Sequence, residues 1–269
     1  MKTILDTIID VKHKEVAELK KRFTYSDFEK SPLFETKCKS LEESIKRSEF
    51  GIIAEFKRKS PSAGLINDHT TPLEQARIYD KANVAGVSCL TDYTFFGGSI
   101  EDLNEIQQNI EAPVLRKDFI IDEIQIFEAK ASGADAILLI SEVLDANTAL
   151  QLTIIAQSLG LEVLMECHDR KHLEQINDQV NIIGINNRNL HLQKTSLDTS
   201  YELFDFIPRE ITCISESGIT SFDEILKLSK TGFDGALIGE SILNKSNPEE
   251  FIKSIQLNPS VSCELKYAD

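Results

Sequence analysis

Ala136-Ile137-Leu138-Leu139-Ile140 is the stretch that decides the fold, because it is apolar at every position. A strand with one exposed face alternates apolar and polar side chains, whereas a strand buried on both faces reads as a continuous apolar run. Strands of the second kind belong mostly to parallel sheets, whose two faces are both covered by other elements. The stretch therefore predicts a strand of a parallel sheet in an α/β protein.

Similar apolar runs occur on both sides of this stretch, separated by helical patterns. From Gly51 onward, short runs of Val, Ile and Leu alternate with amphipathic helical patterns such as residues 72–79 and 122–129. Several of these patterns open with Asp, Ser or Thr, which are good helix N-caps. The predicted strands are Ile52–Glu55, Val87–Thr91, Pro113–Lys117, Ala136–Ile140, Leu161–Glu166, Ile182–Asn186, Thr212–Glu216 and Gly235–Gly239.

The number and spacing of these units favour one architecture. Eight units of roughly 20 to 35 residues each, with no long interruption, fit a closed (β/α)8 TIM barrel better than an open doubly wound sheet. A doubly wound fold would also need a ligand fingerprint. Neither Gly-x-Gly-x-x-Gly after the first strand nor Gly-x-x-x-x-Gly-Lys-Ser/Thr anywhere is present, which argues against nucleotide binding.

The first fifty residues follow a different pattern. Apolar residues recur there at near-helical spacing among many Lys and Glu residues, which predicts amphipathic helices. These apolar residues are Ile4, Ile8, Val11, Val16 and Leu19. We therefore expect a single domain with an N-terminal helical extension over residues 1–50, a barrel over 51–256 and a C-terminal tail over 257–269.

Charge and composition narrow the classes of partner. The formal net charge of -15 argues against nucleic-acid binding, although basic residues in a cleft can still hold a small anionic substrate. The N-terminus lacks a small-residue cleavage site, and no stretch approaches the roughly 18 apolar residues of a membrane span. The five cysteines are scattered and form no Cys-x-x-Cys pair. We expect a cytoplasmic protein with reduced thiols, no membrane partner and a monomeric state.

Polar residues gather at the predicted strand ends. In a barrel enzyme the reactive groups come from the carboxyl ends of several strands. A single lysine at such a position would usually be solvated, so the prediction of a site depends on the convergence of many residues. In chain order they are Glu55 and Lys57, Thr91, Lys117, Ser141, Glu166, Asn186 and Arg188, Glu216 and Ser217, and Gly239.

Spacing gives a direction to some of these side chains. Alternate residues of a strand share a face, so we expect Glu55 and Lys57 to enter one cavity while Phe56 points to the other side. Asn186 and Arg188 are also two positions apart. If the strand persists that far, they share a face, which suits recognition of a planar carboxylate by an amide and a guanidinium.

The roles of Lys117 and Glu166 stay open at this level. A lysine at a barrel mouth acts as a Schiff-base nucleophile, a general acid or an anion ligand, and the sequence does not choose among the three. Glu166 would lie in a pocket whose apolar walls raise its pKa and whose lysines lower it. Its protonation state is therefore undecided.

Two glycine-containing segments end the last two strands. Residues 215–219 and 238–241 lead into helices at the position where barrels often bind phosphate through backbone N–H groups. Glu240 fits this interpretation if its backbone N–H faces the anion and its carboxylate points outward. We therefore predict a phosphate site there.

His168 and His172 have the spacing that puts two imidazoles on one face of a helix, as some metal sites require. No third clustered ligand is evident, however. The neighbouring residues 169–171 are all charged, which favours a solvated helix start over a metal site.

Five segments together closely resemble the indole-3-glycerol phosphate synthase family of tryptophan biosynthesis, and the resemblance covers essentially the whole chain. The first segment is fairly specific alone, and all five occur in the family's order. The N-terminal extension also resembles the family's extra helices, which cover part of the barrel mouth. The segments are residues 55–62, 115–119, 165–166, 184–190 and 215–218.

The resemblance implies a carboxy-lyase that closes the ring of 1-(2-carboxyphenylamino)-1-deoxyribulose 5-phosphate, with loss of carbon dioxide and water, to give indole-3-glycerol phosphate. It implies no cofactor and no metal. Lys117 would protonate the developing alkoxide, Lys57 and Glu166 are candidates for the second acid and the base, and Glu55 would orient a lysine. The implied catalytic residues are Glu55, Lys57, Lys117, Glu166, Asn186 and Ser217; the implied substrate-binding residues are Ser60, Phe119, Arg188, Glu216, Gly218, Gly239 and Glu240.

Within these sets, the resemblance places Asn186 and Arg188 on the anthranilate side of the substrate and the serines, glycines and Glu240 backbone on the phosphate side. The alternatives are another phosphate-binding barrel, such as phosphoribosylanthranilate isomerase or a Schiff-base aldolase, and a catalytically silent barrel that binds a metabolite. Fold alone does not decide among them.

Overall fold

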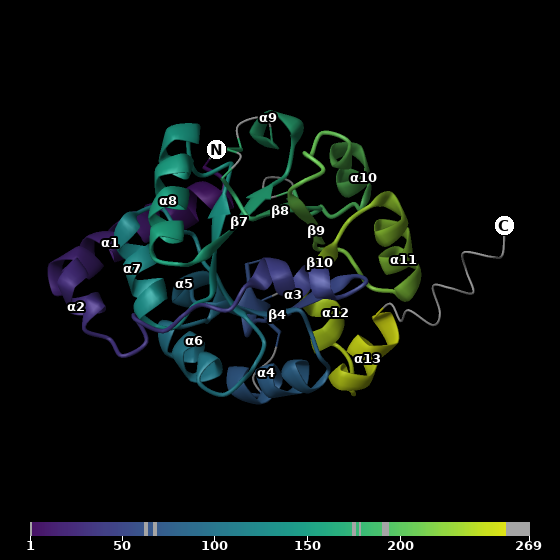
Figure 1. The fold of residues 1–269 in the computed structure, drawn as a ribbon, viewed down its shortest axis with the longest axis horizontal. Helices are drawn as coiled ribbons and strands as arrows, with labels where there is room; N and C mark the ends of the chain where they lie inside the picture. Colours follow the sequence, from purple (N-terminus) through teal and green to yellow (C-terminus); the bar gives the residue numbers. More distant parts are fainter. Residues whose placement is uncertain are drawn as a thin grey trace.

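A computed structural model describes residues 2–61, 64–66, 69–173, 176–177, 179–189 and 194–256. Eight parallel strands close a barrel in the order β1-β10-β9-β8-β7-β6-β5-β4, which confirms the predicted (β/α)8 architecture (Figure 1). Gly51 pairs with Gly235 where the last strand meets the first. The predicted tail over 257–269 lies outside the described residues. The barrel strands are β1 (Gly51–Phe56), β4 (Gly86–Leu90), β5 (Val114–Lys117), β6 (Ala136–Ile140), β7 (Glu162–Cys167), β8 (Ile182–Asn186), β9 (Thr212–Glu216) and β10 (Gly235–Ile238).

Helices follow the strands around the outside of the barrel. The predicted helix at 72–79 begins at Pro72 after a capping box between Thr71 and Glu74, and the one at 122–129 has Asp122 as its N-cap. The stretch after β1 contains two short antiparallel strands, β2 (Lys59–Ser60) and β3 (Gly64–Leu65). The outer helices are α4 (Pro72–Lys81), α5 (Tyr93–Phe96), α6 (Ile100–Gln107), α7 (Glu123–Ala131), α8 (Ala146–Ser158), α9 (Arg170–Leu173), α10 (Asp198–Phe204), α11 (Phe222–Thr231), α12 (Glu240–Leu243) and α13 (Pro248–Ile255).

The strands are buried on both faces, as the run at 136–140 predicts. Leu138 and Ile140 belong to the cluster inside the barrel. Ile137 and Leu139 belong to the larger cluster between the sheet and the outer helices. All five positions of this strand are therefore apolar because each side chain enters one of two cores.

The N-terminal extension begins with α1 (Ile4–Arg22) and α2 (Tyr25–Glu29), followed by α3 (Leu41–Arg47). In Figure 1, α3 lies across the middle of the barrel. Its Leu41 and Ile45 are 0% exposed and are part of the cluster inside the barrel. A Cβ atom at Gly86 would lie 2.4 Å from Cδ1 of Leu41, so glycine leaves room for this plug.

Helix α1 packs against α7 and covers the other end of the barrel. Its Leu5, Ile8 and Val16 are buried, and Val16 forms a small apolar cluster with Phe28 and Ile124. The expectation that the extension covers part of the mouth is confirmed, because α1 contributes apolar side chains to the cavity described below.

A buried ionic cluster ties α1 to the barrel. Lys12 Nζ lies 3.0 Å from Asp92 Oδ2 and 2.9 Å from Asp118 Oδ1, with the Lys12 side chain only 4% exposed. Asp118 also accepts a hydrogen bond from Thr91 at 2.6 Å and pairs with Arg116 at 3.1 Å. Burial opposes the charge of Asp118, but Lys12 and Arg116 outweigh it and hold the pKa of this carboxyl below its usual range.

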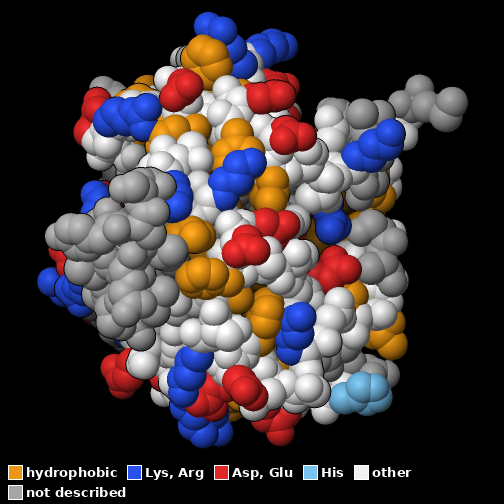
Figure 2. All heavy atoms as spheres, turned by 90° about the vertical axis from the view of Figure 1, so that its right-hand side faces the viewer, with side chains coloured by type: hydrophobic (Ala, Val, Ile, Leu, Met, Phe, Trp, Pro, Cys, Tyr) orange, Lys and Arg blue, Asp and Glu red, His pale blue; other side chains and the backbone are white. Residues whose placement is uncertain are grey.

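Surface charge is distributed rather than concentrated on the face that Figure 2 shows, where Lys and Arg side chains are interspersed with Asp and Glu side chains. Among the described residues, no helix combines the length and the apolar character that crossing a membrane would need.

Candidate active site

Two adjoining cavities, with volumes of about 130 Å³ and about 370 Å³, lie at the carboxyl ends of the barrel strands. Every catalytic and substrate-binding residue that the family resemblance implies lines one or both of them. Those of the first cavity are Glu55, Lys57, Ser60, Lys117, Phe119, Glu166, Asn186, Arg188, Glu216 and Ser217. Gly218, Gly239 and Glu240 line the second cavity, which also shares Glu55, Lys57, Arg188 and Ser217 with the first.

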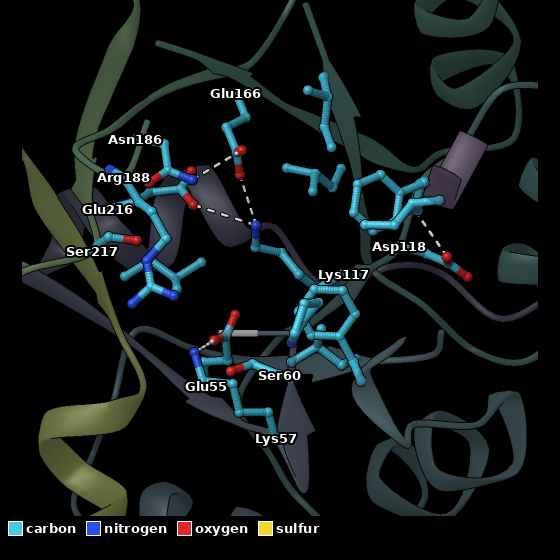
Figure 3. Close-up of a pocket in the computed structure, with 18 of the residues that line it drawn as sticks. Glu55, Lys57, Ser60, Lys117, Asp118, Glu166, Asn186, Arg188, Glu216 and Ser217 are labelled. Carbon is cyan, nitrogen blue, oxygen red and sulfur yellow. Dashed lines mark hydrogen bonds and ion pairs between the residues drawn. The ribbon is translucent and has the colours of Figure 1, made fainter. Parts of the chain in front are cut away.

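Lys117 and Glu166 form the central ion pair of the first cavity. Lys117 Nζ lies 2.7 Å from Glu166 Oε2 and 3.5 Å from Glu216 Oε2 (Figure 3). Asn186 donates a hydrogen bond to the other oxygen of Glu166 at 3.0 Å. Strands β5, β7, β8 and β9 thus direct one polar side chain each toward the same point, as the alternation of side chains along each strand allows.

The neighbouring charges and the burial of Lys117, Glu166 and Glu216 determine their protonation states, which the sequence alone did not decide. Burial opposes the charge of Lys117, but Glu166, Glu216 and Glu55 outweigh it and raise the lysine pKa. Burial also opposes ionisation of Glu166, yet Lys117 and His168 lower its pKa. Burial raises the pKa of Glu216 to about 8, with the charge of Glu166 acting in the same direction and Lys117 opposing it. At neutral pH the trio is therefore an ammonium, a carboxylate and a carboxylic acid.

Gly184 makes room for this arrangement. On β8 it pairs with Ile214 of β9, and a Cβ atom at Gly184 would lie 2.1 Å from Oε1 of Glu216, two residues further along β9. A larger residue would displace the carboxyl group from the cavity. Within the described residues, Glu216 Oε1 is buried and accepts no hydrogen bond, so it is available to a ligand.

Lys57 and Glu55 form a second ion pair at 2.9 Å, on the opposite side of the cavity from Glu166 (Figure 3). Both enter the cavity, whereas Phe56 lies in the outer core, which confirms the predicted directions. Burial opposes ionisation of Glu55, but Lys57 and then Lys117 lower its pKa. A Cβ atom at Gly239 would lie 2.9 Å from Glu55 Oε1, so glycine allows this carboxylate its place.

Arg188 lies at the boundary of the two cavities. Its backbone N–H donates to Asn186 Oδ1 at 2.9 Å, which fixes the chain where it leaves β8. Its guanidinium lies 3.6 Å from the carboxylate of Glu240. The Glu240 side chain is 47% exposed, so its carboxylate lies at the rim of the cavity, and the outward direction of this carboxylate stays a prediction.

The turn after β9 has an unusual backbone. Ser217 and Gly218 have φ angles of +67° and +81°, and the left-handed region is costly for a residue with a side chain. Asn187 holds this turn, because its Nδ2 donates to the backbone oxygens of Glu216 and Ser217, each at 3.0 Å. The backbone is thereby shaped around the second cavity.

Some functional residues were missed by sequence reasoning. The wall of the first cavity opposite the charged groups is apolar and includes Ile4, Leu5 and Ile8 of α1. Phe96 was also missed; it forms an aromatic pair with the predicted Phe119, with ring centroids 6.1 Å apart. Apolar residues outside the strand ends carry no signal that separates a cavity wall from a core.

Two strand-end residues do not line either cavity. Thr91 follows Leu90, which faces the cavity, so the Thr91 side chain lies on the other side of the strand with Arg116 and Asp118. Ser141 is buried outside both cavities. The strand-end pattern is therefore right for most positions and wrong by one residue at these two.

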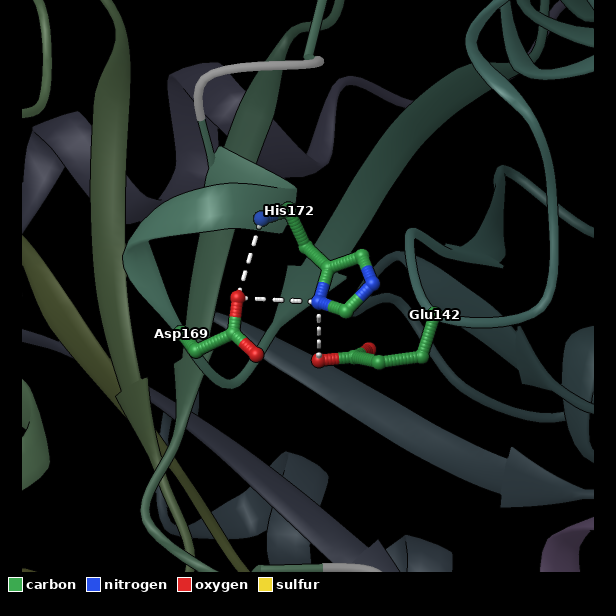
Figure 4. Close-up of side chains that lie close together, drawn as sticks. All are labelled: Glu142, Asp169 and His172. Atoms are coloured by element: carbon green, nitrogen blue, oxygen red, sulfur yellow. Dashed lines mark hydrogen bonds and ion pairs between the residues drawn. The ribbon is translucent and has the colours of Figure 1, made fainter.

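The histidines after β7 lie in a cluster that the sequence did not indicate. Figure 4 shows His172 beside Asp169 and Glu142, whose carboxylate and imidazole atoms lie within 4.8 Å of one another. Asp169 Oδ1 accepts the backbone N–H of His172 and lies 2.9 Å from its Nδ1. These are the contacts of a hydrogen-bonded network, and we assign no metal to it. The predicted solvated helix start is right for Asp169, but the side chain of His168 is only 8% exposed.

Comparison with known proteins gives a consistent result. A family model described as indole-3-glycerol phosphate synthase matches residues 5–255. The chain is 40% identical over 260 residues to the indole-3-glycerol phosphate synthase of Bacteroides thetaiotaomicron, covering 95% of this chain and 100% of that protein. It is 42% identical over 257 residues to the Exiguobacterium sibiricum protein of the same name, covering 94% and 96% of the two chains.

Solved structures support the fold. A mutant tryptophan synthase alpha-subunit from Pyrococcus furiosus superposes with a TM-score of 0.59 at 14% identity, covering 76% of this chain and 97% of that chain. The alpha subunit from Legionella pneumophila gives a TM-score of 0.58 at 11% identity, covering 80% and 96%. At these identities the likeness concerns architecture alone.

Proposed function

The chain belongs to the indole-3-glycerol phosphate synthase family, and on that basis we propose that it converts 1-(2-carboxyphenylamino)-1-deoxyribulose 5-phosphate to indole-3-glycerol phosphate in tryptophan biosynthesis. Carbon dioxide and water leave during this ring closure. The observation that carries the proposal is that Lys57, Lys117 and Glu166 come from three separate strands and line one cavity.

Ring closure requires the aryl carbon that bears the carboxylate to attack the sugar ketone. The new carbon–carbon bond pushes the carbonyl electrons onto oxygen, and this alkoxide needs a proton. Lys117 is suited to donate it, because Glu166 at 2.7 Å keeps the lysine as an ammonium. The carboxylate then leaves as carbon dioxide, and its bonding electrons restore the aromatic ring.

The second half of the reaction removes the new hydroxyl group as water. A general acid protonates the leaving hydroxyl while a base takes the proton whose loss completes the indole double bond. We assign the acid to Lys57, which Glu55 orients at 2.9 Å, and the base to Glu166. Neutral Glu216 adds an acceptor oxygen and a donor close to the reacting groups.

The two cavities match the two ends of the substrate. The apolar wall of α1 and Phe119 suits the aryl ring, while Arg188 with Asn186 suits its carboxylate. The second cavity suits the phosphate, because Ser217, Gly218 and Gly239 present backbone without bulky side chains there. Ser60 lines the first cavity only, so its place on the phosphate side stays a prediction.

A Schiff-base role is disfavoured by the same geometry. A lysine that attacks a carbonyl must first lose its proton, and nearby cations or apolar surroundings normally assist that loss. Lys117 faces the Glu166 carboxylate at 2.7 Å instead, which holds its proton in place. The family match also favours the synthase over an isomerase or an aldolase.

The function is tested by mixing the purified protein with the carboxyphenylamino substrate and recording indole fluorescence, which no tryptophan of the protein obscures. Lys117→Met is expected to abolish turnover while leaving the circular dichroism spectrum and substrate binding largely intact. The exposed Lys37→Met is the matched control and should retain full activity. Near-normal turnover by Lys117→Met would overturn the mechanism, and trapping of Lys117 by borohydride would favour the aldolase.

A further inference from the structure

His168 lies between two carboxylates at the barrel mouth. It follows β7 two positions after Glu166, so its side chain points to the same interior. Its Nε2 lies 3.5 Å from Glu166 Oε1, and its Nδ1 lies 2.9 Å from Glu142 Oε1. The imidazole is thus inserted between the candidate base and a second acid that reaches it from the loop after β6.

The outer carboxylate is itself held in place. Glu142 Oε1 accepts the backbone N–H of His168 at 3.0 Å and lies 3.6 Å from His172 Nδ1. His172 in turn contacts Asp169, which is 55% exposed at the surface (Figure 4). A continuous line of polar contacts therefore connects solvent to His168.

Two carboxylates within ion-pair distance of one imidazole favour its charged form, because the imidazolium is attracted to both, although within the described residues neither ring nitrogen has a hydrogen-bond partner. Burial opposes that charge, but Glu142 and Glu166 outweigh burial and raise the His168 pKa, with Glu216 of β9 acting in the same direction. The ammonium of Lys117 on β5 disfavours a second cation nearby. It pairs with Oε2 of Glu166, however, whereas His168 faces Oε1.

We propose that His168 is a positioning residue for the reaction: as an imidazolium held by Glu142, it fixes the Glu166 carboxylate and keeps it ionised opposite Lys117. The proposal rests on the function assigned above. Each oxygen of Glu166 then has defined partners, with Lys117 on Oε2 and both Asn186 and His168 on Oε1. These contacts oppose rotation of Glu166 and keep it unprotonated until it accepts the substrate proton.

The decisive variant is His168→Gln, which keeps an amide donor near the Nε2 position but removes the charge. Loss of a cation within about 4 Å raises a carboxyl pKa by about one unit or more. The acid limb of the kcat–pH profile should therefore move upward by about one pH unit. On the plateau, kcat should fall by less than the ~100-fold that loss of a proton-transfer group costs. The exposed His13→Gln on α1 is the matched control and should leave the profile unchanged.

A second variant tests whether Glu142 acts through His168. Glu142→Gln should also move the acid limb upward, because the imidazole loses the partner that keeps it charged. Adding Glu142→Gln to His168→Gln should produce no further shift, since the group it supports is already gone. An unchanged profile in His168→Gln, or additive shifts in the double variant, would overturn the proposal.

A measurement without substrate separates this inference from the assigned function. Imidazole resonances of the wild-type protein, titrated by NMR, should show His168 losing its proton at higher pH than an ordinary histidine, and Glu142→Gln should lower that midpoint. If the wild type fails to turn over the substrate, the function is wrong whatever this titration shows. If the wild type is active but His168 titrates at or below the ordinary value, the positioning role is wrong.

Discussion

Lys12 Nζ lies 2.9 Å from Oδ1 of Asp118, the residue that directly follows Lys117. The same ammonium lies 3.0 Å from Asp92, whose side chain is 0% exposed. One buried cation of α1 therefore holds two acids that follow neighbouring strands of the barrel. The position of the extension and the geometry around Lys117 are consequently linked through one side chain.

Replacing this cation should weaken both the fold and substrate binding. Lys12→Met removes the cation that pairs with the buried Asp92 and leaves Asp118 with Arg116 as its remaining buried cation, and breaking a buried ion pair typically costs about 3–5 kcal/mol of unfolding free energy. The KM should also rise, because α1 supplies the apolar wall of the first cavity. Urea denaturation and steady-state kinetics measure the two effects. The exposed Lys14→Met, on the same helix, is the control, and a Lys12 variant as stable as that control would contradict the anchoring role.

The protonated state of Glu216 predicts a pH dependence of stability. Its pKa is raised by burial to about 8 in the folded protein, so between its ordinary value and that pH the folded state binds more protons than the unfolded state. The stability that Glu216 contributes is complete below the unfolded pKa and is lost as the pH rises through the folded one. Glu216→Gln, which stays neutral, should gain stability relative to wild type by at most about 1.4 kcal/mol per pH unit across this range.

Urea unfolding of both proteins at several pH values between 5 and about 8 measures this difference. The exposed Glu210→Gln serves as the control and should track the wild type at every pH. A constant difference between Glu216→Gln and wild type would show that Glu216 is already ionised in the folded protein.

Arg188 is expected to act mainly in binding. A charge-assisted hydrogen bond contributes about 1.5–3 kcal/mol, so Arg188→Ala should raise KM by roughly tenfold or more with a smaller change in kcat. Arg188→Lys should restore little, because an ammonium cannot present two parallel donors to a carboxylate. The exposed Arg209→Ala is the control. An unchanged KM in Arg188→Ala would remove this residue from carboxylate recognition.

Gly184 offers a test of steric room around Glu216. Gly184→Ala should destabilise the fold by about 1–3 kcal/mol and lower kcat, because the new methyl group would lie 2.1 Å from Glu216 Oε1. In a Glu216→Ala background the clash partner is absent, so the same substitution should cost much less. A double-mutant cycle on unfolding free energies measures this coupling. Equal costs in both backgrounds would place the strain elsewhere.

Much of the fold was readable because each strand carries its own local pattern. The run at 136–140 is a strand over the predicted residues, and the other predicted strands agree to within a residue or two. Directions along a single strand were also readable, since alternation places Glu55 and Lys57 together without knowledge of any other strand.

Contacts between units were not readable in the same way. The charges of Lys117 and Glu166 depend on a 2.7 Å contact between residues 49 positions apart, and no local pattern carries that distance. An error of one residue at a strand end also changes which side chain is predicted to reach the site. The strand-end pattern indicated Ser141 as a site residue, but the next residue, Glu142, is the one that contacts His168. Successive side chains of a strand point to opposite faces, so an error of one position selects the wrong side chain.

The plug formed by α3 has a consequence for biosynthesis. Leu41 and Ile45 leave the ribosome before any of the strands that enclose them, and the enclosure is complete only when Gly235 of β10 meets Gly51 of β1. During refolding, amides of α3 should therefore gain protection from hydrogen exchange no earlier than those of β10, and earlier protection in a pulse-labelling experiment would contradict this order. The apolar side chains of α3 are therefore synthesised early but stay exposed until β10 closes the barrel. Exposed apolar segments of this kind are targets for chaperones.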